Sequence, residues 1–332
     1  SVGALVSGGS TYTATGNFNR TTAGAAVGYY VDNGTADNRG TINLTGAGAA
    51  AAGMVAEGSV SAIATVKNSS TITADDAVGM VALTGTGTSI GINTGTINVT
   101  TGTGVYVEGT NAEFNGAGGT INLTGAGTGI VLDNTGARKV TNAGTITLAP
   151  SSVGVYGDNA KIDFPVTVNG TSGTGIYAEN GSVVSGTINA GNSKDTVAVY
   201  LADNTASVNG AEITAGGVTS TSSIGLYLGG TALTHTVGNS AINAPTSGTI
   251  GILTDNGNTI NYSSTTNVGN GAIGMYLKGA GTILNANAGT INITGTGIGV
   301  LVDTGVTANL GTTGTLTVNF NGGGGILSFN NG

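Results

Sequence analysis

The chain contains no cysteine and no tryptophan, and only three prolines and one histidine among its 332 residues. Without cysteine it can form neither a disulfide framework nor a thiolate metal site. Charged residues make up only 7% of the chain, against roughly 25% in an average domain. Hydrophobic residues still make up 39% and recur in phase, so the composition favours a folded chain over a disordered one.

Basic residues are scarce as well. Eight of them stand against sixteen acidic residues, and they are too scattered to form the basic stripe of a nucleic-acid-binding protein. No apolar run approaches the roughly 18 residues that a membrane-spanning helix needs. We therefore expect no nucleic-acid partner and no membrane span in this segment. Neither end carries the polar cap of a free solenoid, so we expect a segment of a longer surface protein.

Glycine, in contrast, is abundant, and many of the 63 glycines mark a repeat. Each copy reads glycine, three or four apolar residues and then an acid or turn residue, as in Gly104–Glu108 and Gly129–Asp133. The copies follow one another at intervals of 21 to 27 residues, a period that is typical of solenoids. The anchor positions of the 14 copies are Gly3, Gly28, Gly53, Gly79, Gly104, Gly129, Gly154, Gly175, Ala198, Gly225, Gly251, Gly274, Gly299 and Gly325.

Each copy also contains two further segments with the character of strands. One alternates polar and apolar residues, which indicates a strand with one buried face. Its clearest examples are Thr41–Thr45, Thr96–Thr100, Thr120–Thr124, Thr145–Leu148 and Thr290–Thr294. The other is shorter and irregular, as in Ala112–Phe114, Lys161–Phe164, Ala206–Val208, Ile260–Tyr262 and Ala308–Leu310. Glycine-rich and asparagine-rich turns separate the segments.

Three short strands per coil predict an all-β fold, a right-handed parallel β-helix of 13 to 14 coils that forms a single β-solenoid over residues 1–332. The anchor glycine is position 0 of each copy. The aliphatic positions +1 and +3, such as Ile130 and Leu226, are expected to point inward, as is Ile291 of the alternating strand. Position +4 is often acidic, and a buried column of unpaired acids would be too costly. Positions 0, +2 and +4 are therefore expected to face outward or enter the turn, with a groove along the glycines.

Position +2 holds seven of the ten tyrosines, namely Tyr30, Tyr106, Tyr156, Tyr177, Tyr200, Tyr227 and Tyr276. Four of them follow one another in successive coils without interruption. A contiguous exposed apolar surface of this kind marks an interaction site. The predicted partner-binding residues are Tyr156, Tyr177, Tyr200, Tyr227, Asp158 and Glu179. The alternative is that the tyrosines stack for stability and that other parts of the protein cover them.

No catalytic, cofactor-binding or metal-binding residue is predicted. The acids at position +4 lack a calcium-binding repeat and are ordinary turn residues. The one adjacent acid pair, Asp75 and Asp76, has no third partner in phase for the acid and base work of a glycosidase. The lone His235 is expected at the surface. Asn-x-Thr triplets such as Asn43–Thr45 match glycosylation acceptors, but ladders of stacked Asn or Thr explain their recurrence better.

The phrases at residues 119–125 (GTINLTG) and 102–108 (GTGVYVE) resemble the passenger domains of large type V autotransporter adhesins, particularly those of fusobacteria. The resemblance covers essentially the whole chain. It implies a rod on the bacterial cell surface or secreted from it, anchored to the outer membrane by a C-terminal barrel that this sequence lacks. It also implies a non-enzymatic role in virulence, the binding of host glycans, host protein receptors or other bacteria.

Two other functions remain open from the residues. Thr-x-Asn-x-Thr strands could present the flat hydroxyl array of an ice-binding solenoid, although breaks such as Val166–Val168 disfavour a lattice match. A polysaccharide-acting β-helix enzyme is disfavoured by the scarcity of basic and paired acidic residues. An assay of thermal hysteresis would separate the first alternative from an adhesin.

Overall fold

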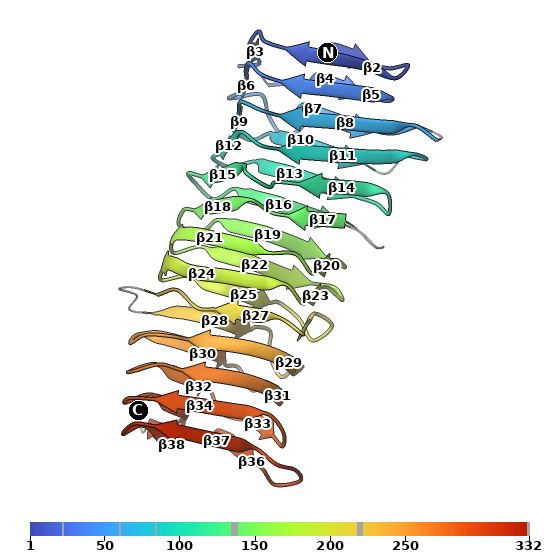
Figure 1. Ribbon diagram of the computed structural model, residues 1–332. Helices are drawn as coiled ribbons and strands as arrows, with labels where there is room; N and C mark the ends of the chain where they lie inside the picture. Colours follow the sequence, from blue (N-terminus) through green and yellow to red (C-terminus); the bar gives the residue numbers. More distant parts are fainter. Residues whose placement is uncertain (22, 60, 84, 134–138, 218–221, 331–332) are drawn as a thin grey trace. The chain divides into compact units, whose positions relative to one another are not determined.

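The computed structural model describes residues 1–21, 23–59, 61–83, 85–133, 139–217 and 222–330, and every regular element in these ranges is a β-strand (Figure 1). The chain divides into two compact units. Unit 1 comprises residues 1–160 and 164–167, and unit 2 comprises residues 161–163 and 168–332. The strands pair in parallel and stack into a β-solenoid of about 13 turns with three strands per coil. The predicted fold class is therefore confirmed.

The glycine phrases form the first sheet of each unit. In unit 1 its strands are β1 (Val2–Val6), β4 (Ala26–Val31), β7 (Ala51–Glu57), β10 (Val78–Leu83), β13 (Thr103–Glu108), β16 (Thr128–Asp133) and β19 (Val153–Asp158). In unit 2 they are β22 (Thr174–Glu179), β25 (Val197–Leu201), β28 (Ser223–Leu228), β30 (Thr249–Thr254), β32 (Ile273–Leu277), β35 (Ile298–Asp303) and β38 (Gly325–Asn330). Each copy of the repeat found in the sequence thus forms one strand of this sheet.

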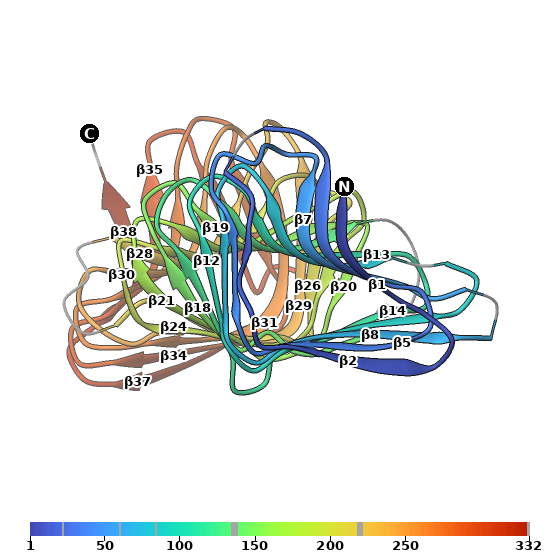
Figure 2. The same cartoon turned by 90° about the horizontal axis from the view of Figure 1, so that it is seen from above.

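Unit 1 has two further sheets, one for each of the other segments of the coil. The irregular segments form β2 (Ser10–Ala14), β5 (Gly34–Asn38), β8 (Ile63–Asn68), β11 (Thr88–Asn93), β14 (Ala112–Asn115) and β17 (Lys139–Asn142). The alternating segments form β3 (Phe18–Asn19), β6 (Thr41–Leu44), β9 (Thr71–Ala74), β12 (Thr96–Val99), β15 (Thr120–Leu123) and β18 (Thr145–Leu148). In Figures 1 and 2 these coils wind clockwise as they recede from the N-terminus, which is the predicted right hand.

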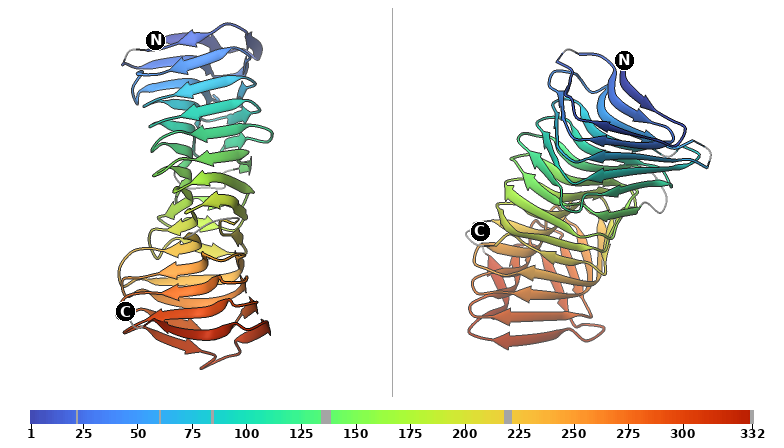
Figure 3. Two further views of the ribbon diagram at one scale, coloured as in Figure 1. Left: turned by 90° about the vertical axis from the view of Figure 1, so that its left-hand side faces the viewer. Right: turned by 45° about the horizontal axis from the view of Figure 1, so that its top comes forward.

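In unit 2 the two other segments of a coil merge in places into one long strand. Figure 3 shows the stacked coils of each unit from two further sides. The short strands are β20 (Lys161–Ile162), β23 (Val183–Val184), β24 (Thr187–Lys194), β26 (Ser207–Asn209), β27 (Glu212–Thr214), β33 (Ile283–Ala286), β34 (Thr290–Thr294), β36 (Thr307–Leu310) and β37 (Thr317–Asn321). The merged strands are β29 (Thr234–Ala244) and β31 (Thr259–Val268), and each pairs with two short strands of a neighbouring coil. One strand, β21 (Val166–Thr171), contains residues of both units.

Aliphatic side chains fill the interior of the coils as the repeat predicts. Ile130, Leu226 and Ile291 are fully buried, which confirms the inward direction of positions +1 and +3 and of the alternating strand. Along each unit, a given inward side chain packs on its counterpart in the next coil because the strands are in register. Burial of such columns supplies most of the driving force for folding.

The prediction that the anchor glycines line an outward groove is wrong. Those between Gly28 and Gly299 are buried, whereas Gly3 and Gly325 in the two end coils are exposed. The strand register passes over the buried ones: Thr103 pairs with Thr128 and Val105 pairs with Ile130, but Gly104 between them has no partner in the register. A Cβ atom on Gly104 would lie 2.6 Å from the carbonyl oxygen of Gly129 in the next coil. The same close approach recurs at Gly28, where the distance to the oxygen of the next anchor is 2.4 Å. Glycine is therefore required here by the distance between coils rather than by its backbone freedom.

Asparagine ladders run along both the inside and the outside of the coils. Asn68 lies in the interior of unit 1, where its amide accepts from Asn38 at 2.8 Å and donates to Asn93 at 2.9 Å. On the outside, the amide of Asn122 donates to Asn98 at 3.1 Å. Unit 2 has a longer outer ladder, made of Asn243, Asn267, Asn292 and Asn319. Among these residues Asn98, Asn122 and Asn292 belong to Asn-x-Thr triplets, so the predicted ladders are present there.

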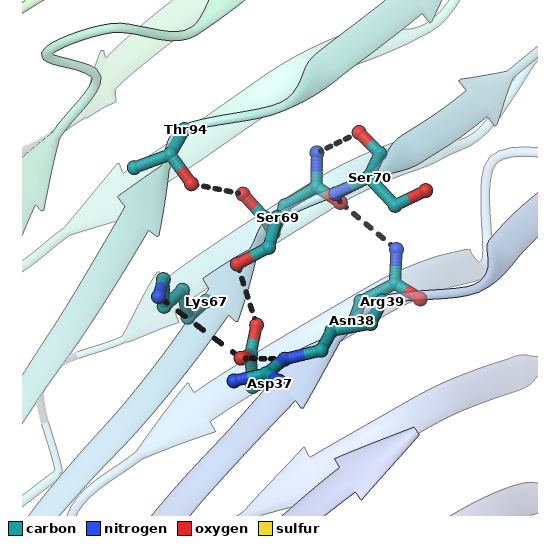
Figure 4. A network of polar contacts seen from close by, with 8 residues as sticks. Asp37, Asn38, Arg39, Lys67, Ser69, Ser70 and Thr94 are labelled. Atoms are coloured by element: carbon teal, nitrogen blue, oxygen red, sulfur yellow. Dashed lines mark hydrogen bonds and ion pairs between the residues drawn. The ribbon is translucent and has the colours of Figure 1, made fainter. Parts of the chain in front are cut away.

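A charged cluster flanks the inner ladder of unit 1. Asp37 accepts hydrogen bonds from Arg39 at 2.8 Å and Ser69 at 2.7 Å, and Lys67 lies 4.0 Å away (Figure 4). Burial acts to raise the pKa of Asp37, but these hydrogen bonds and the two nearby cations together lower it. The carboxylate is thus held in its charged form beside a ladder of neutral amides.

Candidate functional site

Three of the predicted tyrosines form a continuous stack on the outside of unit 2. Tyr177 in β22, Tyr200 in β25 and Tyr227 in β28 are in strict register. Their ring centroids are 5.0 Å apart in both steps, and the rings are nearly parallel, with interplanar angles of 9° and 7°. All three side chains are half-buried. We call these three residues the tyrosine ladder.

The stacking determines what the ladder presents to a partner. The ring of Tyr200 has one face against Tyr177 and the other against Tyr227. Leu253 follows Tyr227 in register in the next coil. Both faces of the Tyr200 ring, and the faces of Tyr177 and Tyr227 that meet it, are therefore not accessible to a sugar ring or another aromatic ring. What remains exposed is a row of ring edges and hydroxyl groups, spaced by the coil repeat of about 4.8 Å.

Tyrosines at position +2 are also tied to the acids at position +4 of the following coil. In unit 2, the hydroxyl of Tyr227 donates to Asp255 at 3.0 Å, and that of Tyr276 donates to Asp303 at 3.1 Å. Unit 1 repeats the arrangement, since Tyr30 donates to Glu57 at 2.7 Å. Another pair of the same kind is Tyr106 and Asp133, at 2.6 Å. The acids were predicted to be ordinary turn residues, but these four also accept hydrogen bonds from tyrosines.

These contacts favour the neutral phenol. Burial, together with the hydrogen bond to Glu57 and its negative charge, raises the pKa of Tyr30 to about 12. Burial and the hydrogen bond to Asp255 raise the pKa of Tyr227 to about 12 in the same way. The hydroxyl groups therefore remain donors at any physiological pH.

Tyr200 and Tyr177 do not have an acid at position +4 of the following coil. The residue at position +4 of the coil after Tyr200 is Gly229, and a Cβ atom there would lie 2.4 Å from the Tyr200 hydroxyl. Among the described residues, that hydroxyl makes no hydrogen bond. For Tyr177 the corresponding residue is Ala202, and the acid that acts on it is Glu179 of its own strand. Burial first, and then the charge of Glu179, raise the pKa of Tyr177.

The remaining predicted residues lie in the other unit or at the edge of the ladder. Tyr156 and Asp158 belong to β19 of unit 1, where both are half-buried and Asp158 pairs in register with Asp133. Glu179 is the last residue of β22, two residues after Tyr177, and is half-buried. The structure therefore brings together Tyr177, Tyr200, Tyr227 and Glu179 within one unit.

Sequence reasoning missed two features of the tyrosine and acid columns. Asp255 belongs to the site as the acceptor of Tyr227, although the signal was present in the spacing of a tyrosine and an acid about 28 residues apart. A shallow cleft of about 480 Å³ lies beside the pair of Tyr30 and Glu57 in unit 1, with Asp32 and Thr86 also in its lining. The cleft depends on how the turns of successive coils pack, which the repeat does not specify.

The other titratable residues considered in the sequence, Asp75, Asp76 and His235, contact other parts of the fold. The hydroxyl of Thr101 lies 3.0 Å from Asp75 and 2.5 Å from Asp76, so the acid pair is tied to the following coil. His235 is fully buried, so its predicted surface position is wrong. It lies on β29, where the irregular segment merges into a long strand and turns its side chain inward. Within the described ranges no group of three or more His, Cys, Asp or Glu could hold a metal ion.

The pKa values of the tyrosines lead to a testable pH dependence. A tyrosine ionises at pH 10.0 when unperturbed, and Tyr30 and Tyr227 ionise at about 12 in the fold. Because the folded state holds the proton more tightly, this stabilisation is complete below pH 10 and is lost as the pH rises toward 12. We expect the tyrosinate absorbance of Tyr30 and Tyr227 to rise only as the pH approaches 12. The β-sheet circular dichroism signal should be lost over the same pH range.

The matched variants for this titration are Glu57→Gln and Asp255→Asn, which remove the negative charge but keep an oxygen acceptor. Each should move the ionisation of its tyrosine back toward pH 10. A titration of the wild-type protein centred on pH 10, with no difference in the variants, would show that the hydroxyl contacts do not persist in solution.

The comparisons with known proteins leave the family open. No protein-family model and no curated protein matches the sequence. One similar solved structure is a hyper-glycosylated fragment of TibA, modified by TibC, with 12% identity and a TM-score of 0.31 over 92% of this chain and 99% of that one. Another is the receptor-binding domain of the siphovirus 9NA tailspike, with 10% identity and a TM-score of 0.25 over 97% of this chain and 73% of that one. Such distant likenesses carry no argument about function. The described residues also include no helix long and apolar enough to cross a membrane.

Proposed function

We propose that this chain is a non-enzymatic adhesive segment of a bacterial surface protein, either held at the outer membrane or secreted. In this proposal it attaches to host glycans, host protein receptors or other bacteria through the tyrosine ladder. The observation that carries the proposal is the ladder itself: three half-exposed tyrosines in register on the outside of successive coils. The surface location rests on the resemblance of the repeat to autotransporter passenger domains.

The ladder has the physical properties of a binding surface. Tyrosine offers a large amphipathic contact at a low entropic cost. Here the cost is lower still, because Tyr177, Tyr200 and Tyr227 already hold one another in place before a partner arrives. The row of edges and hydroxyls suits a partner that extends along the solenoid axis, such as a glycan chain or an extended peptide. Glu179 and Asp255 at its margins can accept hydrogen bonds from that partner.

The test is a triple variant in which Tyr177, Tyr200 and Tyr227 are replaced by Ser. We expect it to fold and to lose most of its attachment to host cells, since each interface tyrosine contributes about 1–2 kcal/mol to binding. The matched control replaces the same number of tyrosines at the same repeat position outside the ladder. Its three changes are at Tyr30, Tyr106 and Tyr276.

A folded ladder variant that attaches as well as the wild-type protein would contradict the proposal and assign the stack a purely structural role. Equal losses in the ladder variant and the control would show a general effect of losing tyrosines. The single variant Tyr156→Ser tests the predicted contribution of this residue of unit 1. Reduced attachment of that variant would show that unit 1 also contributes to binding.

A further inference from the structure

The single histidine of the chain is buried beside the tyrosine ladder. The side chain of His235 is fully buried in β29, and its Nε2 lies 2.9 Å from the carbonyl oxygen of Gly229. A carbonyl oxygen only accepts, so Nε2 carries the hydrogen and donates it. The other ring nitrogen, Nδ1, therefore lacks a hydrogen in the neutral ring. It is buried and makes no hydrogen bond among the described residues.

His235 helps to hold the connection between β28 and β29, residues 229–233. The side-chain nitrogen Nδ2 of Asn258 lies 3.2 Å from the same Gly229 oxygen and 3.3 Å from the carbonyl oxygen of Gly230. The amide oxygen of Asn258 accepts from the backbone of Leu233 at 2.9 Å. Ala232 in this connection has a φ of 54°, a strained conformation for a residue with a side chain. The connection thus keeps its shape because His235 and Asn258 bind its carbonyl groups.

The same connection contacts the ladder. Gly229 fits against Tyr200 so closely that a Cβ atom there would meet the hydroxyl at 2.4 Å, and its backbone N–H donates to Leu201 at 2.8 Å. A displacement of Gly229 therefore reaches the middle ring of the ladder directly. His235 is two contacts away from Tyr200: imidazole to Gly229, and Gly229 to the tyrosine hydroxyl.

We propose that His235 is an acid-sensitive latch, which holds the connection 229–233 against Tyr200 while the imidazole is neutral and releases it when the imidazole is protonated. Protonation adds an N–H at Nδ1, and the residues that the structure describes offer no acceptor for it. A charged ring with an unmade hydrogen bond is costly in a buried site. The proton is therefore taken up by conformations in which the connection has opened to water.

The surrounding charges do not reverse this effect. Burial lowers the pKa of His235, while the hydrogen bond to Gly229 and the negative charge of Asp203 act in the opposite direction and only partly compensate. Asp203 is itself held in the charged form by hydrogen bonds from Thr205 and the backbone of Asn180. The folded state therefore binds the imidazole proton less tightly than the unfolded chain. The stability of this region is complete above the ordinary histidine pKa of about 6.5 and falls as the pH drops below it.

The direct test is amide hydrogen exchange at residues 226–235 between pH 7.5 and pH 5.0, corrected for the intrinsic pH dependence of exchange. We expect the opening equilibrium of these amides to increase by up to about tenfold per pH unit below about pH 6.5. Unit 1 contains no histidine, so its amides serve as an internal control. The variant His235→Gln keeps an N–H for the Gly229 oxygen but does not titrate. Its exchange should be independent of pH in this range.

Protection that is independent of pH in the wild-type protein would overturn the latch, as would the same pH dependence in His235→Gln. If that variant fails to fold, an NMR titration of the one imidazole in the wild-type protein decides the matter. A pKa well below 6.5 supports the latch, and a value at or above 6.5 overturns it.

The consequence for binding rests on the proposed function. If the ladder is the contact surface, attachment should weaken at pH 5.5 in the wild-type protein and remain unchanged in His235→Gln. Acid-induced opening without any change in attachment would leave the latch established and count against the ladder as the adhesive surface.

Discussion

Replacing Ile130 with Asp should unfold the coils around β16. The side chain of Ile130 is fully buried between Val105 and Val155 of the neighbouring coils. Truncation to Ala alone is expected to cost about 2–5 kcal/mol, because it leaves a cavity in the column. A carboxylate costs more, since its register neighbours Val105 and Val155 are aliphatic and the charge would be buried against them without a partner.

Urea unfolding followed by circular dichroism measures this effect, with Ile130→Thr and Val131→Thr as a matched pair. Val131 is the next residue of the same strand and is half-buried on the outer face. We expect a marked loss of stability in Ile130→Thr and a small change in Val131→Thr. Near-equal stabilities in this pair, or wild-type melting of Ile130→Asp, would show that the inward phase of β16 is wrong.

The second large effect is expected at an anchor glycine. Gly104→Ala places a methyl group 2.6 Å from the Gly129 oxygen and 3.1 Å from the side chain of Ile121, so the two coils must move apart. Overpacking of this kind costs about 1–3 kcal/mol. Gly104→Val should cost more, because its additional methyl groups meet the same neighbours. The loss is measured as a lower urea midpoint with an unchanged slope.

The chain offers its own control for this prediction. Ala198 occupies the anchor position of β25 and is fully buried, so one coil tolerates a methyl group there. Ala198→Gly should therefore cost only the roughly 0.5–1 kcal/mol lost when a glycine replaces an alanine in regular structure. A Gly104→Ala protein as stable as the wild type would mean that the coils adjust at every anchor position as they do at Ala198.

The repeat in the sequence predicted most of the architecture. Its period gave the number of coils, and the alternation in segments such as Thr96–Thr100 gave parallel strands with one buried face. The aliphatic positions +1 and +3 gave the core, as Ile130 and Leu226 show. These features follow from one coil alone, since a strand alternates its side chains between two faces and the apolar face must be buried.

The direction of the anchor glycines could not be obtained in this way. Simple alternation puts position 0 on the face opposite to position +1, and that reasoning fails where two successive residues, Gly104 and Val105, are both buried. The pairing skips the glycine, and the carbonyl oxygen of the neighbouring coil occupies the space that a side chain would need there.

The candidate site shows the same division between the sequence and the tertiary structure. The sequence by itself determined that tyrosines form an outward column and that acids follow at position +4, because both are fixed by the phase of the repeat. Only the tertiary structure decided that the rings of Tyr177, Tyr200 and Tyr227 stack face to face, that Tyr227 bonds Asp255, and that His235 is buried against Gly229. These contacts join residues of different strands, and their distances depend on how non-identical turns and merged strands pack between coils. A local pattern fixes which face a side chain takes, whereas its partners are fixed by the packing of the coils on one another.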